Sequence, residues 1–146
     1  MASSRITRYL MPHVYENKLG EIAYEKGVVR LTHNDYEPDI CFRNAGKATA
    51  FQPKQPAFPP PDFIVEIVSD STRDRDRNAG SVGIKMTDYA LHGVQEYWII
   101  DTGQEAIEQY ILDGNAFPLF QKLKDDQLAA KAITGSSIRV KDVFAA

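Results

Sequence analysis

The chain has 146 residues, of which 43% are hydrophobic, and its 17 basic and 20 acidic residues give a formal net charge of −3. This length and composition are typical of one compact α/β or α+β domain and do not indicate long disorder. No apolar run approaches the roughly 18 residues that cross a bilayer. The single cysteine, Cys41, excludes an internal disulfide and a cysteine-rich zinc site.

The N-terminal residues have no apolar core and no small-residue cleavage site, so we expect no secretory signal. A reducing cytoplasm is the simplest setting for such a chain. The slight acidic excess counts mildly against a DNA partner, because nucleic-acid-binding proteins usually carry a basic excess. A nuclease, however, needs only a local basic cleft, and its metal-binding carboxylates lower the net charge. The net charge therefore does not decide between these classes.

The first third of the chain predicts one helix followed by strands. Residues 7–17 look like the end of a helix that stops near residues 18–20. β-prone residues are frequent from Gly20 to Phe42, and His33-Asn34-Asp35 supplies a turn. Pro38 then opens a short strand over residues 39–42.

The rest of the chain predicts a central apolar strand within a mixed sheet. Residues 43–61 contain five prolines and indicate an irregular loop. Residues 63–68 form the most apolar strand, which is typical of the middle of a sheet covered on both faces. A short helix over residues 84–92 ends at Gly93, a common C-terminal cap. Further strands are expected at 96–101, 107–112, 119–123 and 138–143.

One residue is anomalous within the most apolar strand, and that residue is Glu66. An unpaired carboxylate there would cost several kcal/mol or take up a proton. A bound divalent cation removes this problem. A second acid, Asp39, directly follows Pro38 on another predicted strand. Mg²⁺ prefers one or two carboxylates together with water and phosphate oxygens, so two acids on neighbouring strands can hold one such ion.

A metal held in this way lowers the pKa of a bound water and neutralises charge on a phosphodiester in its transition state. A nearby ammonium group would orient the water or stabilise that charge, and Lys85 is the candidate. The spacing alone leaves a second interpretation open. In it Glu66 points out of the sheet and pairs with an arginine, Asp39 caps a turn and Lys85 is solvated.

Several segments resemble one known family. They are Glu37–Phe42, Pro61–Ser69, Ser71-Thr72, Lys85 with Tyr89, and Gly93–Asp101. In these segments the chain resembles the Uma-two family of restriction endonuclease-like proteins, within the PD-(D/E)xK nuclease superfamily. The likeness runs from about Leu19 to Phe144. It implies a single α/β (α+β) domain over residues 1–146, with a restriction endonuclease-like core in which few helices flank a mixed central sheet.

The resemblance also implies residue roles. Asp39 and Glu66 match the two acids of the family's motif. Val68 stands where the superfamily's usual lysine would be, and Lys85, with Tyr89 one turn further on, matches a lysine that has moved to the following helix. The Glu96-Tyr97-Trp98 segment matches a signature that we interpret as structural.

The implied activity is hydrolysis of DNA by a Mg²⁺- or Mn²⁺-dependent endonuclease. Asp39, Glu66 and the backbone carbonyl of Ile67 (or of Val68) would hold the metal, and Lys85 would assist the attacking water. Many proteins of this superfamily dimerise, so we expect a homodimer by analogy. A further set of residues would contact phosphate or form an exposed charged loop, and these are Arg73, Arg75 and Arg77.

Two departures from the family's pattern keep other hypotheses open. The chain resembles an N-terminally shortened member, and residues 73–83 look longer than is typical, which makes the position of Lys85 less certain. The second hypothesis is therefore a catalytically degenerate member that binds DNA or protein. A third is an unrelated α/β domain that imitates the motif, which a sheet bearing both acids on adjacent strands would exclude. Two neighbouring residues have structural interpretations: Asp62 starts a strand, and Cys41 is a buried, inert thiol.

Overall fold

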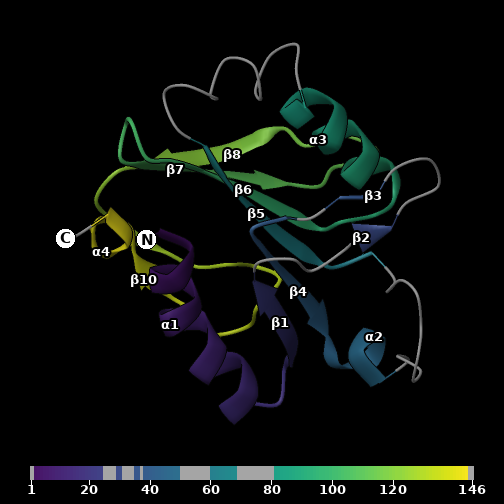
Figure 1. Ribbon diagram of the computed structural model, residues 1–146, viewed down its shortest axis with the longest axis horizontal. Coiled ribbons are helices and arrows are strands. Elements are labelled where there is room, and N and C mark those ends of the chain that lie inside the picture. The colour runs from purple at the N-terminus through teal and green to yellow at the C-terminus, as the bar shows by residue number, and fades with distance from the viewer. Residues whose placement is uncertain are drawn as a thin grey trace.

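A six-stranded mixed sheet runs through the protein, with strand order β1-β4-β5-β6-β7-β8 (Figure 1). The computed structural model describes residues 2–24, 29–30, 35–36, 38–49, 60–68 and 81–144. The strands of the sheet are β1 (Gly20–Tyr24), β4 (Ile40–Asn44), β5 (Phe63–Val68), β6 (Glu96–Asp101), β7 (Ala106–Ile111) and β8 (Leu119–Leu123). β5 and β6 are parallel, and the other neighbours are antiparallel. Two short antiparallel pairs complete the β structure: β2 (Val29–Arg30) with β3 (Asp35–Tyr36), and β9 (Gln127–Leu128) with β10 (Ile138–Arg139).

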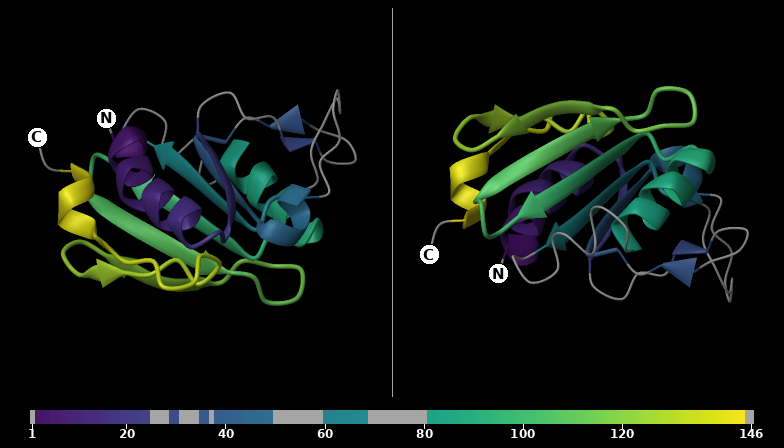
Figure 2. Two further views of the ribbon diagram at one scale, coloured as in Figure 1. Left: turned by 90° about the horizontal axis from the view of Figure 1, so that it is seen from below. Right: turned by 90° about the horizontal axis from the view of Figure 1, so that it is seen from above.

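Helices cover both faces of the sheet. Figure 2 shows α1 (Ala2–Glu16) and α3 (Ser81–Leu91) on opposite sides of it. α1 and the short α4 (Val140–Phe144) pack with Phe63, Trp98 and Ile100 in one apolar cluster. α3 packs with Ile64, Tyr97 and other residues of the opposite face in a second cluster. A further short helix, α2 (Ala45–Thr49), directly follows β4.

This double coverage explains why β5 and β6 are so apolar. Side chains alternate between the two faces of a strand, so a central strand covered on both sides reads as an almost continuous hydrophobic run. Every residue of β6 is buried. On the α1 side the rings of Phe63 and Trp98 meet edge to face, with their centroids 4.9 Å apart. Glu66 is thus held in the best-packed part of the molecule.

The C-terminal end of α3 is fixed by Gly93, as the sequence predicts. Gly93 has φ of 79°, in the left-handed region that favours glycine. Its N–H donates to the carbonyl of Ala90 at 3.2 Å, and the N–H of Val94 donates to the carbonyl of Tyr89 at 3.0 Å. These two bonds are the Schellman motif. They set the direction in which the chain enters β6.

Two of the predicted segments differ from the structure. The predicted strand 138–143 is wrong after Arg139, because Val140 and Val143 are both buried and their spacing of three residues suits a helix. The predicted loop 43–61 begins too early, since β4 continues to Asn44 and α2 follows. Asn44 caps α2, its side-chain oxygen accepting a bond from the N–H of Lys47 at 3.0 Å. The predicted turn at 33–35 and most of the proline-rich segment lie outside the described residues.

Asp62 has the structural role that its position predicts. Its carboxylate accepts a hydrogen bond from the N–H of Asn44 at 2.7 Å and lies 3.1 Å from the ammonium of Lys47. Its own carbonyl accepts bonds from the N–H groups of Gln95 and Glu96. Asp62 therefore joins the ends of three strands and is not directed at a metal.

Replacing Asp62 tests this structural role. We expect Asp62→Ala to lower the free energy of unfolding by about 1–3 kcal/mol, because a part-buried N–H loses its acceptor. Lys47→Met removes the partly exposed ion pair and the hydrogen bond from the Lys47 ammonium to the Pro60 carbonyl, and should cost less than about 1 kcal/mol. Urea denaturation followed by circular dichroism measures both. Equal losses in the two variants would contradict the assignment.

Within the part of the chain that the structure describes, no helix is both long and apolar enough to span a membrane.

Candidate active site

Asp39 directly precedes β4, and Glu66 lies on the adjacent strand β5. β4 and β5 are antiparallel with Ile40 opposite Val65, so Asp39, one residue before β4, comes opposite Glu66. The Asp39 carboxylate accepts a hydrogen bond from the N–H of Ile67 at 2.7 Å. That bond fixes Asp39 against the residue that follows Glu66. This arrangement argues against an unrelated domain that merely imitates the motif.

Glu66 faces the α3 side of the sheet and is only 6% exposed. Ile64 and Val68 lie two residues before and after Glu66 and so share its face of β5, and both belong to the apolar cluster under α3. The Lys85 ammonium, on α3, lies 3.8 Å from Glu66 Oε1, and the Lys85 side chain is 25% exposed. Glu66 thus faces the side of the sheet that α3 covers, with the Lys85 ammonium within ion-pair distance.

The peptide group of Ile67 lies on the same side of β5 as Asp39. Within a strand, the N–H and C=O of one residue project to the same side, toward the same neighbouring strand. Because the Ile67 N–H reaches the Asp39 carboxylate, the Ile67 carbonyl oxygen is also directed toward the Asp39 side. Two carboxylates, one backbone carbonyl and one ammonium group therefore come together at this end of the sheet.

This donor set fits a hard divalent cation. Mg²⁺ takes oxygen ligands and usually binds through one or two carboxylates, with water and substrate phosphate completing its shell. Among the described residues, no three side chains of Asp, Glu, His or Cys come close enough together to hold a metal by themselves. A cation held by Asp39 and Glu66 would therefore need oxygen ligands besides the described side chains.

Tyr97 lies beneath the two acids. Burial first, and then the negative charges of Glu66 and Asp39 together with the neighbouring tyrosines, raise the pKa of the Tyr97 hydroxyl well above its usual value. The hydroxyl therefore stays protonated at neutral pH. Tyr97 and Tyr89 pack with their ring centroids 5.8 Å apart, which fixes α3, and with it Lys85, over the sheet.

Cys41 faces the same side of the sheet as Asp39 but is a buried thiol, as expected. Burial raises its pKa, against the opposing effects of the Arg43 charge and of a hydrogen bond from Arg43 to its sulfur. A thiol that resists deprotonation is a poor nucleophile.

Sequence reasoning missed another buried acid on the same face of the sheet as Glu66, two strands away from it. Ile99 is opposite both Glu66 on β5 and Glu108 on β7, so Glu108 lies in the same row and on the same face as Glu66. Glu108 is buried and accepts a hydrogen bond from the hydroxyl of Tyr110. Lys122 follows in the row, 3.7 Å from Glu108. The predicted pairing of the two strands that flank the turn at 102–103 could have indicated that Glu108 lies in this row.

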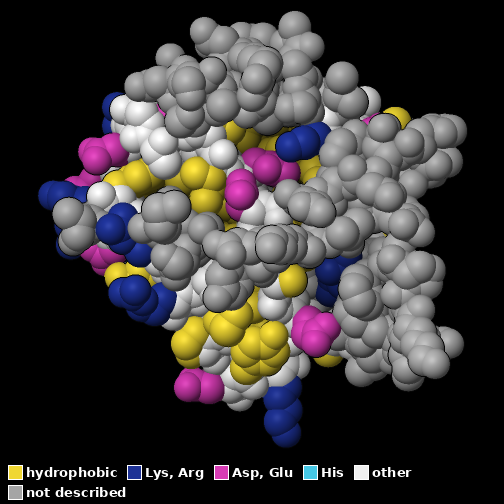
Figure 3. Space-filling model, in the orientation of Figure 1, with side chains coloured by type: hydrophobic (Ala, Val, Ile, Leu, Met, Phe, Trp, Pro, Cys, Tyr) yellow, Lys and Arg dark blue, Asp and Glu magenta, His cyan; other side chains and the backbone are white. Residues whose placement is uncertain are grey.

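Figure 3 shows the resulting surface, with acidic side chains (magenta) gathered beside a basic one (blue) over β5 and β6. Three predicted phosphate contacts, Arg73, Arg75 and Arg77, lie outside the described residues.

The fold is that of a nuclease-like α/β protein. It is similar to a solved crystal structure from Anabaena variabilis, titled "a putative nuclease belonging to DUF820", with a TM-score of 0.75 and 17% sequence identity. The match covers 98% of this chain and 78% of that one. No protein with a curated description matches the chain.

The sequence profile of the Uma2 family, described as "putative restriction endonuclease", matches residues 2–140. The chain belongs to this family, as the resemblance in its motifs predicts.

Proposed function

We propose that the protein is a metal-dependent endonuclease that hydrolyses DNA phosphodiester bonds. The observation that carries this proposal is the convergence of Asp39, Glu66 and Lys85 around the Ile67 peptide, with the Lys85 ammonium 3.8 Å from Glu66. Membership of the Uma2 family supports a nuclease. The metal dependence goes beyond that family description and rests on the donor set, whereas the DNA substrate is proposed from the family's description as restriction endonucleases.

In this proposal Asp39, Glu66 and the carbonyl of Ile67 hold Mg²⁺ or Mn²⁺. When bound, the ion would lower the pKa of a water molecule and neutralise charge on the phosphate. The N–H of Ile67 keeps the Asp39 carboxylate in place, so one peptide group positions one acid and contributes an oxygen itself. The buried position of Glu66 holds its carboxylate in a single orientation.

Lys85 is the proposed group for charge stabilisation. Its ammonium is partly exposed, on the α3 side of the site, and is drawn toward Glu66 by opposite charge. It donates hydrogen bonds either to the attacking water or to a phosphate oxygen, and such donors are worth most where water is excluded. Lys85 on α3 would thus take the role of the superfamily's usual lysine, whose position on the strand is occupied by Val68.

The substrate side of the proposal includes further groups. Arg73, Arg75 and Arg77 are proposed phosphate contacts, since arginine forms paired hydrogen bonds to phosphate. A homodimer, with one active site for each DNA strand, and action in the cytoplasm are carried over from the family resemblance and the single cysteine.

The first test is cleavage of plasmid and single-stranded DNA with Mg²⁺ or Mn²⁺, followed by gel electrophoresis. We expect metal-dependent nicking that EDTA abolishes. Lys85→Met should lower the rate by about a hundredfold or more, because one preorganised donor is lost. The matched control is Lys18→Met, which removes an exposed lysine beyond the end of α1 and should leave the rate unchanged.

Two results would contradict the proposal. A well-folded wild type that binds DNA without cutting it would favour the binding-only relative. Full activity in Lys85→Met would remove Lys85 from the chemistry and return it to a structural role.

A further inference from the structure

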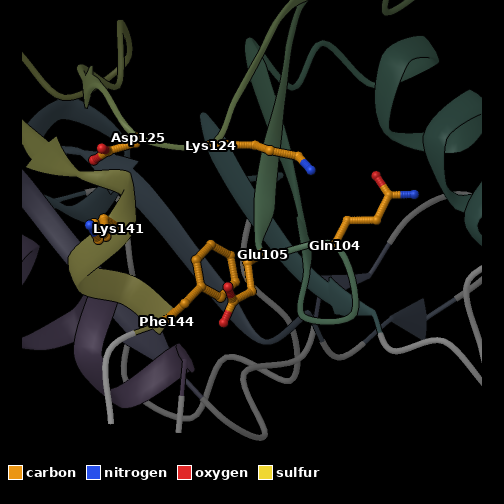
Figure 4. A pocket seen from close by; sticks show the side chains of 6 residues that line it. All are labelled: Gln104, Glu105, Lys124, Asp125, Lys141 and Phe144. Carbon is orange, nitrogen blue, oxygen red and sulfur yellow. The ribbon is translucent and has the colours of Figure 1, made fainter.

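A cavity of about 420 Å³ lies at one end of the sheet, away from the two acids. It is lined by Gln104, Glu105, Lys124, Asp125, Lys141 and Phe144 (Figure 4). Its size is in the range of small-molecule and nucleotide sites, which begin at about 300 Å³. We propose that this cavity binds a nucleotide of the substrate strand, some positions away from the phosphate that is cleaved. The proposal rests on the nuclease function proposed above.

The wall of the cavity is attached to the strand that carries Glu66. The N–H and the hydroxyl of Thr102 both donate to the carbonyl of Val68, each at 3.0 Å. The N–H of Gln104 donates to the Asp101 carboxylate at 3.0 Å. The turn between β6 and β7 is therefore held against the carboxyl end of β5. A strand of nucleic acid that leaves the acids on the α3 side would pass this turn before it reaches Lys141 and Phe144 of α4, which packs on the other side of the sheet.

Polar contacts lead from Glu108, two strands beyond Glu66, to the wall of the cavity. Glu108, in the same row as Glu66, lies 3.7 Å from the Lys122 ammonium, which donates to the side-chain oxygen of Gln104 at 2.6 Å. Lys122 is on β8, three strands from β5. At about 4.8 Å per strand the distance is roughly 14 Å. This corresponds to about four nucleotides at the duplex rise of 3.4 Å.

The side chains of the cavity match the parts of a nucleotide. Figure 4 shows Lys124 extending toward the side of Gln104, and the Phe144 ring beside the Glu105 carboxylate. Asp125 lies 3.4 Å from Arg139, so the two lysines of the cavity face one remaining acid, Glu105. A lysine attracts phosphate, and an aromatic ring stacks on a base of any sequence. Glu105 is an acceptor for the amino group of a base.

The test uses a fluorescein-labelled ten-nucleotide single-stranded DNA and the same sequence as RNA. Anisotropy titrations in EDTA measure affinity without cleavage. We expect Lys124→Met and Phe144→Leu each to weaken binding about fivefold or more, because stacking of one base is worth at least this factor. Phe144→Leu keeps an apolar side chain for packing against the core. Lys124→Met should also lower the slope of log affinity against log salt by about 0.7.

The control is Lys18→Met. Arg5 donates to the carbonyl of Val143, so the first turns of α1 lie against α4 and the cavity side. Lys18 is 13 residues further on, about 20 Å along a helix. Its replacement should leave the affinity within about twofold, the slight change expected for one distant exposed lysine.

The two assays distinguish failure of the cavity proposal from failure of the nuclease proposal. In Mg²⁺, both cavity variants should raise KM and leave kcat nearly unchanged, because the cavity touches no reacting atom. A wild type that does not cleave would overturn the nuclease proposal, and the affinities in EDTA would still decide the cavity. Affinities of Lys124→Met and Phe144→Leu within twofold of wild type would overturn the nucleotide site, whatever the cleavage assay shows.

Discussion

Glu66→Gln should lower metal-dependent cleavage by about a thousandfold or more, which is about 4 kcal/mol of transition-state stabilisation. The substitution keeps the size of the side chain and removes the charge of a buried ligand. Because Asp39 and the Ile67 carbonyl stay in place, the site would keep its shape but hold a divalent ion weakly. Initial rates on plasmid DNA over a range of Mn²⁺ concentrations measure the loss. High Mn²⁺ should restore part of the activity if weak binding is the cause.

A stability measurement separates this loss from damage to the fold. A ligand that binds only the folded state at a hundred times its Kd stabilises it by about 2.7 kcal/mol. We therefore expect Mn²⁺ to raise the Tm of the wild type and to leave that of Glu66→Gln unchanged. Glu21→Gln, an exposed acid on β1, is the matched control and should behave as the wild type. A Tm that rises equally in Glu66→Gln would contradict metal binding by Glu66.

Much of the fold follows from the sequence because burial on two faces leaves a strong pattern. The almost continuous apolar runs of β5 and β6 predict central strands, and the structure confirms both. The helix between them is also predicted, with Gly93 at its end. The pattern fails near residue 140. Val140, Lys141, Asp142 and Val143 are too few to distinguish alternation from a helical turn, and only tertiary packing makes them a helix.

The placement of the candidate site is partly predictable for a related reason. A charged residue in an apolar strand is conspicuous, so Glu66 draws attention without any structure. The position of Lys85 depends on how α3 packs over the sheet, through contacts such as Tyr89 against Tyr97, and the motif resemblance alone indicated it. Glu108 was missed because a polar residue on a partly apolar strand is usually exposed, whereas both Glu108 and the adjacent Gln109 are buried. Only the register places it in the same row as Glu66, two strands away.

A second large effect, on the free energy of unfolding, is expected at Glu96, which lies on the face of the sheet opposite to that of Glu66. Glu96 is 1% exposed and accepts three hydrogen bonds. They come from the indole N–H of Trp98 at 2.7 Å, the side-chain amide of Gln109 at 2.7 Å and the N–H of Ala132 at 2.9 Å. Through these hydrogen bonds the Glu96 carboxylate links the chain around residue 132 to β6 and β7.

We expect Glu96→Ala to lower the free energy of unfolding by about 3–5 kcal/mol. The substitution leaves several buried donors without their acceptor, at about 1–3 kcal/mol for each unsatisfied group. Since folded domains are stable by only about 5–15 kcal/mol, this is a large fraction of the total. Chemical denaturation measures the loss, and Glu16→Ala, an exposed acid in the last turn of α1, is the control. A loss below 1 kcal/mol in Glu96→Ala would contradict this linking role.

The same carboxylate gives stability a defined pH dependence. Burial raises the pKa of Glu96 above its ordinary value of 4.5, although its hydrogen bonds oppose the rise. The folded chain therefore holds this proton more tightly than the unfolded chain does. The stabilising contribution of that proton is complete below the ordinary pKa and is lost as the pH rises through the raised one. Glu96→Gln has no proton to release, so the difference in unfolding free energy between wild type and Glu96→Gln should shrink between pH 4.5 and neutrality. A difference that grows with pH would show that the hydrogen bonds outweigh burial and hold the carboxylate in its charged form.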